Sequence, residues 1–141
     1  VREKLASKKI ELLQTADEGL PNVFVQPDQL QHALVQVLDN AINAIEGETR
    51  RITTSMKRMG DDLVQLEIVD TGRGIPASAI KKVFEPFYTR KDEWGGQGLG
   101  LAEAQQIISA NHGIIKIRST VGQGTTVSIL VPVATERAHL V

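Results

Sequence analysis

The segment from about residue 29 to residue 46 reads as one long amphipathic helix, and it constrains the fold more than any other part of the chain. Successive side chains of a helix turn by about 100°, which gathers the apolar residues into one stripe. This stripe consists of Leu30, Leu34, Val37, Leu38, Ala41 and Ile45, and it must be buried against another apolar layer. Gln36, Asn40 and Asn43 fall together on the opposite face. Asparagine is a poor helix-interior residue, so this face indicates either contact with solvent or a function.

Apolar alternation and turn residues predict the remaining elements. In chain order they are strands at 10–14, 23–26, 51–59 and 63–70, a short helix at 78–84, a helix at about 99–111, and strands at 113–119 and 125–132. Asp28 is the predicted N-cap of the long helix. Because hairpins and helices are mixed in this order, we expect an α+β two-layer sandwich. Its one mixed sheet would have about five strands, covered on one face by about three helices.

Both ends of the chain are expected to lie outside this sandwich. Residues 1–8 read as the end of a helix that enters from upstream, because Leu5 and Ala6 alone cannot form a core. Residues 136–141 are expected to form a frayed tail.

Composition excludes several classes of function. Sixteen basic and seventeen acidic residues give a net charge of −1, which argues against a nucleic-acid partner. The chain has no cysteine, which excludes disulfides, thiolate zinc sites and thiol nucleophiles. No apolar run approaches the roughly 18 residues that a membrane-spanning helix needs. We therefore expect a soluble, cytoplasmic domain without redox chemistry.

Half of the twelve glycines lie in two short stretches, at 72–74 and 95–100. Glycine serves where the backbone needs a positive φ or approaches another group closely, so these stretches indicate either two tight turns or a cradle for a ligand. The common nucleotide signatures are absent: there is no phosphate loop of the GxxxxGK[ST] type, no dinucleotide fingerprint, and no HRD or DFG motif. The three histidines are too scattered in the sequence for a metal triad.

Another nucleotide-binding design emerges when separate stretches are taken together. They are QVLDNAINA at 36–44, DTGRGI at 70–75, VFEPFY at 83–88, GGQGLGL at 95–101 and GTT at 124–126. In this order they resemble the N, G1, F, G2 and G3 boxes of the catalytic ATP-binding domain of sensor histidine kinases. That domain has the Bergerat fold, shared with gyrase-type topoisomerases, heat-shock chaperones and mismatch-repair ATPases. Each box alone is weak evidence, but five in order, in a resemblance that covers residues 9–133, are specific. The resemblance implies an ATP-binding catalytic domain at residues 9–135.

The resemblance implies that Asp70 accepts a hydrogen bond from the adenine amino group. A carboxylate at the end of a buried strand needs such a partner. Gly72 and Gly74 would let the backbone pass beneath the purine, Ile75 would be a further nucleotide-binding residue, and Thr125 would add a hydroxyl through water. The alternative for Asp70 is an Asx turn that begins the sequence TGRG.

The second glycine stretch is expected to bind the phosphates, because free N–H groups and the positive end of a helix dipole attract anions. The residues concerned are Gly96, Gln97, Gly98, Leu99, Gly100 and Leu101. The alternative is a flexible loop before an ordinary helix start. Arg90 and Lys91 open the expected ATP lid, which runs to Trp94, and one of them would meet phosphate charge. Tyr88 is a further expected nucleotide-binding residue.

Asn40 is the expected Mg²⁺ ligand, because its carboxamide oxygen suits a hard cation whose charge triphosphate already neutralises. A solvated helix face is the alternative. Gln36 departs from the family pattern, in which this position is usually Asn in histidine kinases and Glu in the hydrolysing relatives. Gln cannot act as a general base, so Gln36 favours a domain that holds ATP for transfer, with a second metal contact as its other role. Asn43 is also an expected nucleotide-binding residue, but its position is often basic in the family, so some phosphate charge would be met by Arg90 or Lys91 instead.

Three of the five aromatic residues, Phe84, Phe87 and Tyr88, lie beside the expected lid. In the family this patch helps to dock the catalytic domain onto the phosphoacceptor helices. The alternative is that these rings anchor the short helix in the core, which is our expectation for Phe84.

The resemblance implies a protein-histidine kinase fragment in two-component signalling, with ATP and Mg²⁺ as cofactors. The acceptor histidine would lie in an upstream helical domain, and a response regulator would be the later partner. The fragment would be a monomer and the full protein a homodimer, which can carry a membrane anchor elsewhere. Two other functions stay open: an anti-sigma-type serine kinase, and a nucleotide-switched interaction module or ATPase of the same superfamily.

Overall fold

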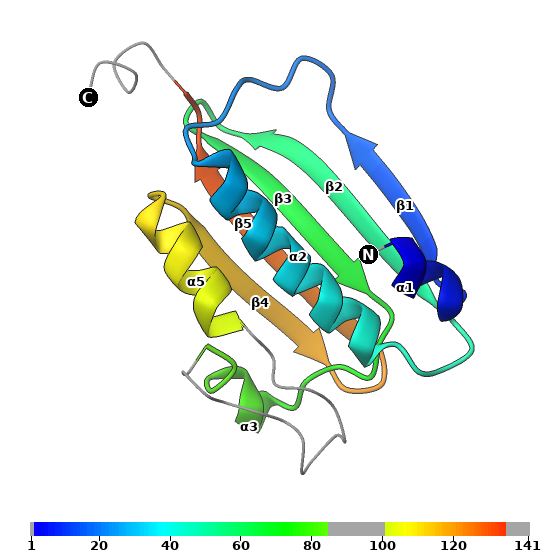
Figure 1. Cartoon of the computed structure of the whole chain (residues 1–141). Helices are drawn as coiled ribbons and strands as arrows, with labels where there is room; N and C mark the ends of the chain where they lie inside the picture. The colour runs from blue at the N-terminus through cyan, green and yellow to red at the C-terminus, as the bar shows by residue number, and fades with distance from the viewer. Residues whose placement is uncertain (1, 85–100, 135–141) are drawn as a thin grey trace.

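The computed structural model describes residues 2–84 and 101–134. Four helices and five strands follow one another in this part of the chain (Figure 1). The elements are α1 (Arg2–Ser7), β1 (Glu11–Ala16), α2 (Pro27–Ala44), β2 (Arg51–Met59), β3 (Leu63–Asp70), α3 (Ala77–Ile80), α5 (Leu101–Ala110), β4 (Ile114–Thr120) and β5 (Gly124–Pro132).

The strands form one mixed sheet in the order β1-β2-β3-β5-β4. Strand β1 pairs with β2 in parallel, and the other three pairings are antiparallel. Helices α2 and α5 lie side by side on one face of this sheet (Figure 1). The predicted two-layer α+β sandwich with five strands is therefore confirmed.

The core lies between the two helices and the sheet. Its largest fully buried side chains are Ile42, Ile45, Ile52, Ile108, Ile129, Val37, Val83 and Val131. The buried face of the long helix differs from the predicted stripe. Ala33 and Ile42 are buried in addition, whereas Leu30 and Leu34 are only half-buried. The reason is that α2 packs against α5 as well as against the sheet, so its buried face is wider than one stripe.

Two local predictions are wrong. The segment 23–26 is not a strand, because only Val23 forms an isolated bridge, with Val133. Asp28 is not the N-cap of α2: the helix begins at Pro27, and the N-cap is Gln26. The upstream origin expected for residues 1–8 stays a prediction, and the structure adds that Leu5 of α1 is only 7% exposed and packs with the core.

Asn111, which the sequence reasoning did not select, joins the end of α5 to the start of α2. Its side chain is a buried polar group, with the residue only 8% exposed. Its Oδ1 accepts a hydrogen bond from the Gln26 backbone N–H at 2.9 Å, and its Nδ2 donates to Gln29 Oε1 and to the Ile107 carbonyl. The buried side-chain amide of Asn111 thus forms hydrogen bonds with residues of both α2 and α5.

Replacing Asn111 by alanine should lower the free energy of unfolding by about 2 kcal/mol, because the buried amide and its three hydrogen bonds are lost and the partly buried Gln26 N–H keeps no protein partner. Urea denaturation measures this change. Ser109→Ala, on an exposed position of the same helix, is the matched control and should change stability by less than about 0.5 kcal/mol. Equal losses in the two variants would contradict the role assigned to Asn111.

Candidate functional site

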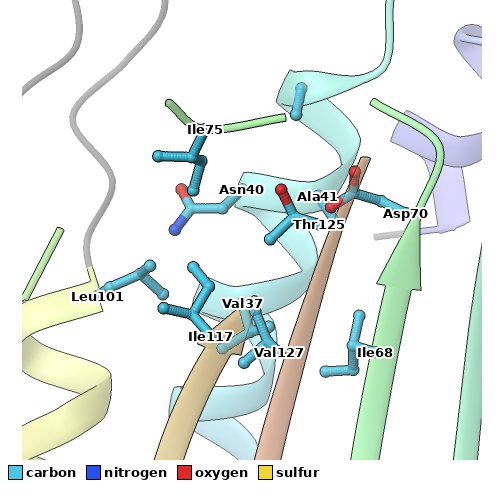
Figure 2. A pocket seen from close by; sticks show the side chains of 11 residues that line it. Val37, Asn40, Ala41, Ile68, Asp70, Ile75, Leu101, Ile117, Thr125 and Val127 are labelled. Carbon is cyan, nitrogen blue, oxygen red and sulfur yellow. The ribbon is translucent and has the colours of Figure 1, made fainter. Parts of the chain in front are cut away.

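A small cavity lies between α2, α5 and the sheet, beside the end of β3 (Figure 2). Its volume is about 30 Å³, and its walls are mostly apolar. The lining residues are Val37, Asn40, Ala41, Ala44, Ile68, Asp70, Ile75, Leu101, Ile117, Thr125 and Val127. Five of the residues selected from the sequence therefore meet here, from separate segments of the chain: Asn40, Asp70, Ile75, Leu101 and Thr125.

Asp70 is the last residue of β3 and is only 5% exposed. Its Oδ1 accepts a hydrogen bond from the Gly72 backbone N–H at 2.8 Å, which is the Asx turn that the sequence left as an alternative. Burial raises the pKa of Asp70 to about 6, against the opposing effect of hydrogen bonds from the Gly72 and Thr125 backbones. The turn and a ligand-binding role are compatible, because a carboxylate has two oxygens and about four acceptor positions.

Thr125 lies opposite Asp70 in the β3–β5 pairing. Its hydroxyl is 2.7 Å from the Ser119 hydroxyl, which also accepts a hydrogen bond from the Ile75 backbone N–H at 2.7 Å. Ser119 in turn donates to the Gly124 carbonyl. Ser119 therefore fixes the loop after β3 onto the β4–β5 hairpin. Sequence reasoning missed it, because a serine in a strand carries no signal of its own.

The glycines at 72 and 74 are required by the protein's own packing. A Cβ at Gly72 would lie 2.7 Å from the Ala44 carbonyl oxygen. Gly74 has a φ of +78°, and a Cβ there would overlap the Thr120 carbonyl oxygen. In this structure the space beside each glycine is thus filled by backbone, which holds the loop against α2 and against the β4–β5 hairpin.

The polar face of α2 is divided between the cavity and the surface. The Asn40 carboxamide points between Ile75 and Leu101 (Figure 2). Gln36 does not line the cavity: its Nε2 donates to Glu103 Oε2 on α5 at 2.7 Å. Asn43 is exposed and also lies outside the cavity lining.

Glu103 receives two hydrogen bonds from α2. The second comes from His32, whose Nε2 lies 2.8 Å from Oε1. The hydrogen bonds from His32 and Gln36 hold the pKa of Glu103 below its ordinary value. Glu103 gave no signal in the sequence, because the contact joins residues that are far apart in the chain.

Several predicted site residues lie outside the described residues. They are Phe87, Tyr88, Arg90, Lys91, Gly96, Gln97, Gly98, Leu99 and Gly100, together with Trp94 and the lid. Phe84 is described, and it packs half-buried against the core, as expected.

The lining has the chemistry of a site for an apolar ring with a hydrogen-bond donor on its edge, but a cavity of about 30 Å³ holds little more than one water molecule, so such a ligand has to displace side chains around it. Apolar side chains form the walls of the cavity, and a buried carboxylate with a neighbouring hydroxyl lies at one end. Within residues 2–84 and 101–134, no three histidine, aspartate or glutamate side chains gather into a metal site of their own. Carboxamide oxygens on α2 fit a cation that arrives with phosphates, because such a cation keeps most of its ligands from phosphate and water.

No helix in the described part of the chain is long and apolar enough to span a membrane.

Comparison with known proteins gives one family. A family model described as histidine kinase-, DNA gyrase B- and HSP90-like ATPase matches residues 25–135. The sensor histidine kinase ZraS of Salmonella typhi is 38% identical over 133 residues, which make up 94% of this chain and 28% of that protein. The adaptive-response sensory kinase SasA of Synechococcus elongatus is 35% identical over 136 residues, covering 94% of this chain and 35% of that protein. The chain thus spans a third or so of the relatives it matches.

Solved structures have the same fold. The catalytic domain of histidine kinase ThkA, in a nucleotide-free form, matches with a TM-score of 0.81 at 26% identity, covering 95% of this chain and 87% of that one. Full-length ShkA in complex with AMPPNP matches with a TM-score of 0.82 at 25% identity, covering 94% of this chain and 27% of that one.

Proposed function

Since the chain belongs to the family of histidine kinase-, DNA gyrase B- and HSP90-like ATPases, we propose that it binds Mg²⁺-ATP and donates the γ-phosphate to a histidine on an upstream helical domain. The observation that carries this proposal is the cavity in which Asp70, Thr125 and Asn40 meet between apolar walls. The similarity to ZraS and SasA, both named as sensory kinases, supports transfer to histidine over the other activities in the family.

In this proposal, Asp70 accepts a hydrogen bond from the exocyclic amino group of adenine. Guanine has a carbonyl oxygen at that position, which a carboxylate repels, so the site would select adenine. Ile75 and Val127 would contact the ring faces, and the Thr125 hydroxyl would bind the ring edge directly or through water. Gly72 and Gly74 would hold the loop that carries Ile75.

The phosphates would lie toward the start of α5. The residues from Gly96 to Leu101 would bind them through backbone N–H groups, with Arg90, Lys91 and Tyr88 nearby, as proposed from the sequence. Asn40 would hold Mg²⁺, which neutralises phosphate charge. In the transfer, the bond between the γ-phosphorus and its bridging oxygen breaks, and a bond to a histidine ring nitrogen forms, leaving ADP. Such a reaction needs positioning and charge neutralisation more than a base, and Gln36 offers no base.

The partners follow from this reaction. They are ATP and ADP, the upstream phosphoacceptor helices and, through the complete kinase, a response regulator. We propose that the 141-residue chain by itself is a monomer and that the complete kinase is a homodimer. ATP is a cytoplasmic nucleotide, so the domain would act in the cytoplasm.

Isothermal titration calorimetry with ATP, with and without Mg²⁺, tests the binding step. Asn40→Ala should weaken Mg²⁺-ATP binding about tenfold, the effect of one lost metal contact, and leave binding of adenosine unchanged. Asn22→Ala, on an exposed loop, is the control. An equal loss for both ligands would mean that Asn40 has a structural role.

Transfer is tested by joining the chain to the phosphoacceptor helices of its own kinase and following phosphate from labelled ATP. An acid-labile, base-stable phosphohistidine is the expected product. A phosphoserine on a partner protein, or ATP binding without any transfer, would favour the serine kinase or the interaction module instead.

A further inference from the structure

Two helices that contribute to the candidate site are joined by a cluster of polar side chains outside the cavity. Gln36 Nε2 donates to Glu103 Oε2 at 2.7 Å, and His32 Nε2 lies 2.8 Å from Glu103 Oε1. Gln36 lies one turn before Asn40 on α2, and Glu103 lies two residues after Leu101 on α5. Both Asn40 and Leu101 line the cavity, so this cluster joins the segments that form one of its walls.

The carboxylate of Glu103 determines how the Gln36 amide is oriented. An ionised carboxylate only accepts hydrogen bonds, whereas an amide has a donor end and an acceptor end. Only the NH₂ group of Gln36 can therefore face Glu103. The carbonyl oxygen Oε1 must then face away from Glu103.

The oxygen that is oriented in this way is buried and has no hydrogen-bond partner among residues 2–84 and 101–134. A buried acceptor without a partner is unfavourable. The unpaired Oε1 therefore indicates that a group bound at the site interacts with it. Residues four apart on a helix share a face, which brings Gln36 next to Asn40. Carboxamide oxygens are suitable ligands for a hard divalent cation or for a water molecule bound to it.

We propose that Glu103 is a positioning residue, which orients the Gln36 carboxamide so that Oε1 joins Asn40 at the Mg²⁺ end of the nucleotide site. This inference rests on the function proposed above. Glu103 itself touches neither the nucleotide nor the cation. Because Glu103 accepts a hydrogen bond from the NH₂ group of Gln36, it disfavours the reversed orientation of that amide, in which the NH₂ group would face the cation and repel it.

The pairing also explains why a glutamine suits position 36 in this chain. A glutamate there would bring a second carboxylate against Glu103, and like charges at hydrogen-bond distance repel. Exchanging the two residues, as Gln36→Glu with Glu103→Gln, keeps one donor and one acceptor in contact. It also leaves a carboxylate oxygen of residue 36 free to face the cation.

The decisive variant is Glu103→Gln in the 141-residue chain, which keeps the size of an exposed side chain and so should leave the fold intact. A glutamine can offer Gln36 either a donor or an acceptor, so the amide loses its fixed orientation. Calorimetry should show that the gain in ATP affinity on adding Mg²⁺ falls about fivefold, the effect of one oxygen contact, while adenosine affinity stays the same. Gln106→Ala, exposed on the same helix, should leave both values unchanged.

The exchanged double variant supplies the rescue. Gln36→Glu alone should lose the Mg²⁺-dependent gain, and adding Glu103→Gln should restore it. An unchanged gain in Glu103→Gln, or an equal loss of adenosine affinity, would overturn the inference and leave Glu103 as a tether between helices. If the unaltered chain binds no ATP at all, the proposed function fails together with this inference. If it binds ATP with Mg²⁺ dependence and Glu103→Gln has no effect, only the inference fails.

Discussion

Asp70→Asn should strongly weaken ATP binding while the domain stays folded. The substitution replaces an acceptor by an amide of nearly the same shape, so the adenine amino group would face either a weaker acceptor or a donor. Loss of one charge-assisted hydrogen bond, with its partner left unpaired, costs about 1.5–3 kcal/mol or more, a fall in affinity of about 10- to 150-fold. Calorimetry measures the affinity, and circular dichroism checks the fold. Asp61→Asn, in the exposed turn between β2 and β3, is the matched control. Unchanged affinity in a folded Asp70→Asn protein would refute the adenine assignment.

Asp70→Asn should also change how the stability of the domain depends on pH. Burial raises the pKa of Asp70 from 3.8 to about 6, so the folded state holds its proton more tightly than the unfolded state. The stability that this proton contributes is fully present below about pH 4 and is lost as the pH rises through about 6. Wild-type stability relative to Asp70→Asn should therefore fall by about 2 kcal/mol between pH 4.5 and pH 7.5. Urea denaturation at the two pH values measures the difference, and a constant difference would contradict the pKa.

Gly74→Ala should be the most destabilising small substitution in the loop after β3. The φ of +78° strains any residue with a side chain, and the new Cβ would overlap the Thr120 carbonyl oxygen. Gly60 supplies a matched control, because its φ is +68° and a Cβ added there would have no neighbouring atom within 4 Å. Gly60→Ala should cost about 1 kcal/mol through backbone strain alone. Gly74→Ala should cost at least about 3 kcal/mol, which is the range of substitutions that displace packed backbone.

Thermal and urea unfolding compare the two glycine variants directly. Any folded Gly74→Ala protein should also bind ATP more weakly, because the shifted loop carries Ile75 away from the cavity. Equal destabilisation of both variants would mean that the contact with Thr120 is easily relieved and that the glycine serves only the backbone angle.

The sequence predicted the elements whose signals are local. The hairpin of β2 and β3 alternates apolar and polar residues around Gly60, and its predicted bounds agree with the structure. The segment 23–26 misled the prediction, since its apolar residues pack from a loop in which Val23 makes a single bridge. The start of α2 was misplaced for a related reason: the backbone N–H of its N-cap residue, Gln26, donates to Asn111, far away in the chain.

The candidate site likewise contains residues with a local sequence signal and residues whose roles depend on partners far away in the chain. Asp70, Asn40 and Thr125 lie in recognisable motifs, and the structure brings them to one cavity. Ser119 and Glu103 act only through partners that the fold supplies, so a single sequence contained no sign of their roles. The contact of Gln36 with α5, away from the cavity lining, likewise depends on how two helices pack.

The walls of the cavity come from α2, β3, β4, β5, the loop that carries Ile75 and the first residue of α5, so no smaller part of the domain contains it. A ligand bound there interacts only with the completely folded chain, and binding and folding become one linked equilibrium. At a ligand concentration of about 100 times Kd, the folded state gains about 2.7 kcal/mol. The nucleotide concentration around this domain therefore helps to determine how long the domain stays folded and resists proteolysis. Variants that are only marginally stable without nucleotide can remain folded when nucleotide saturates the site.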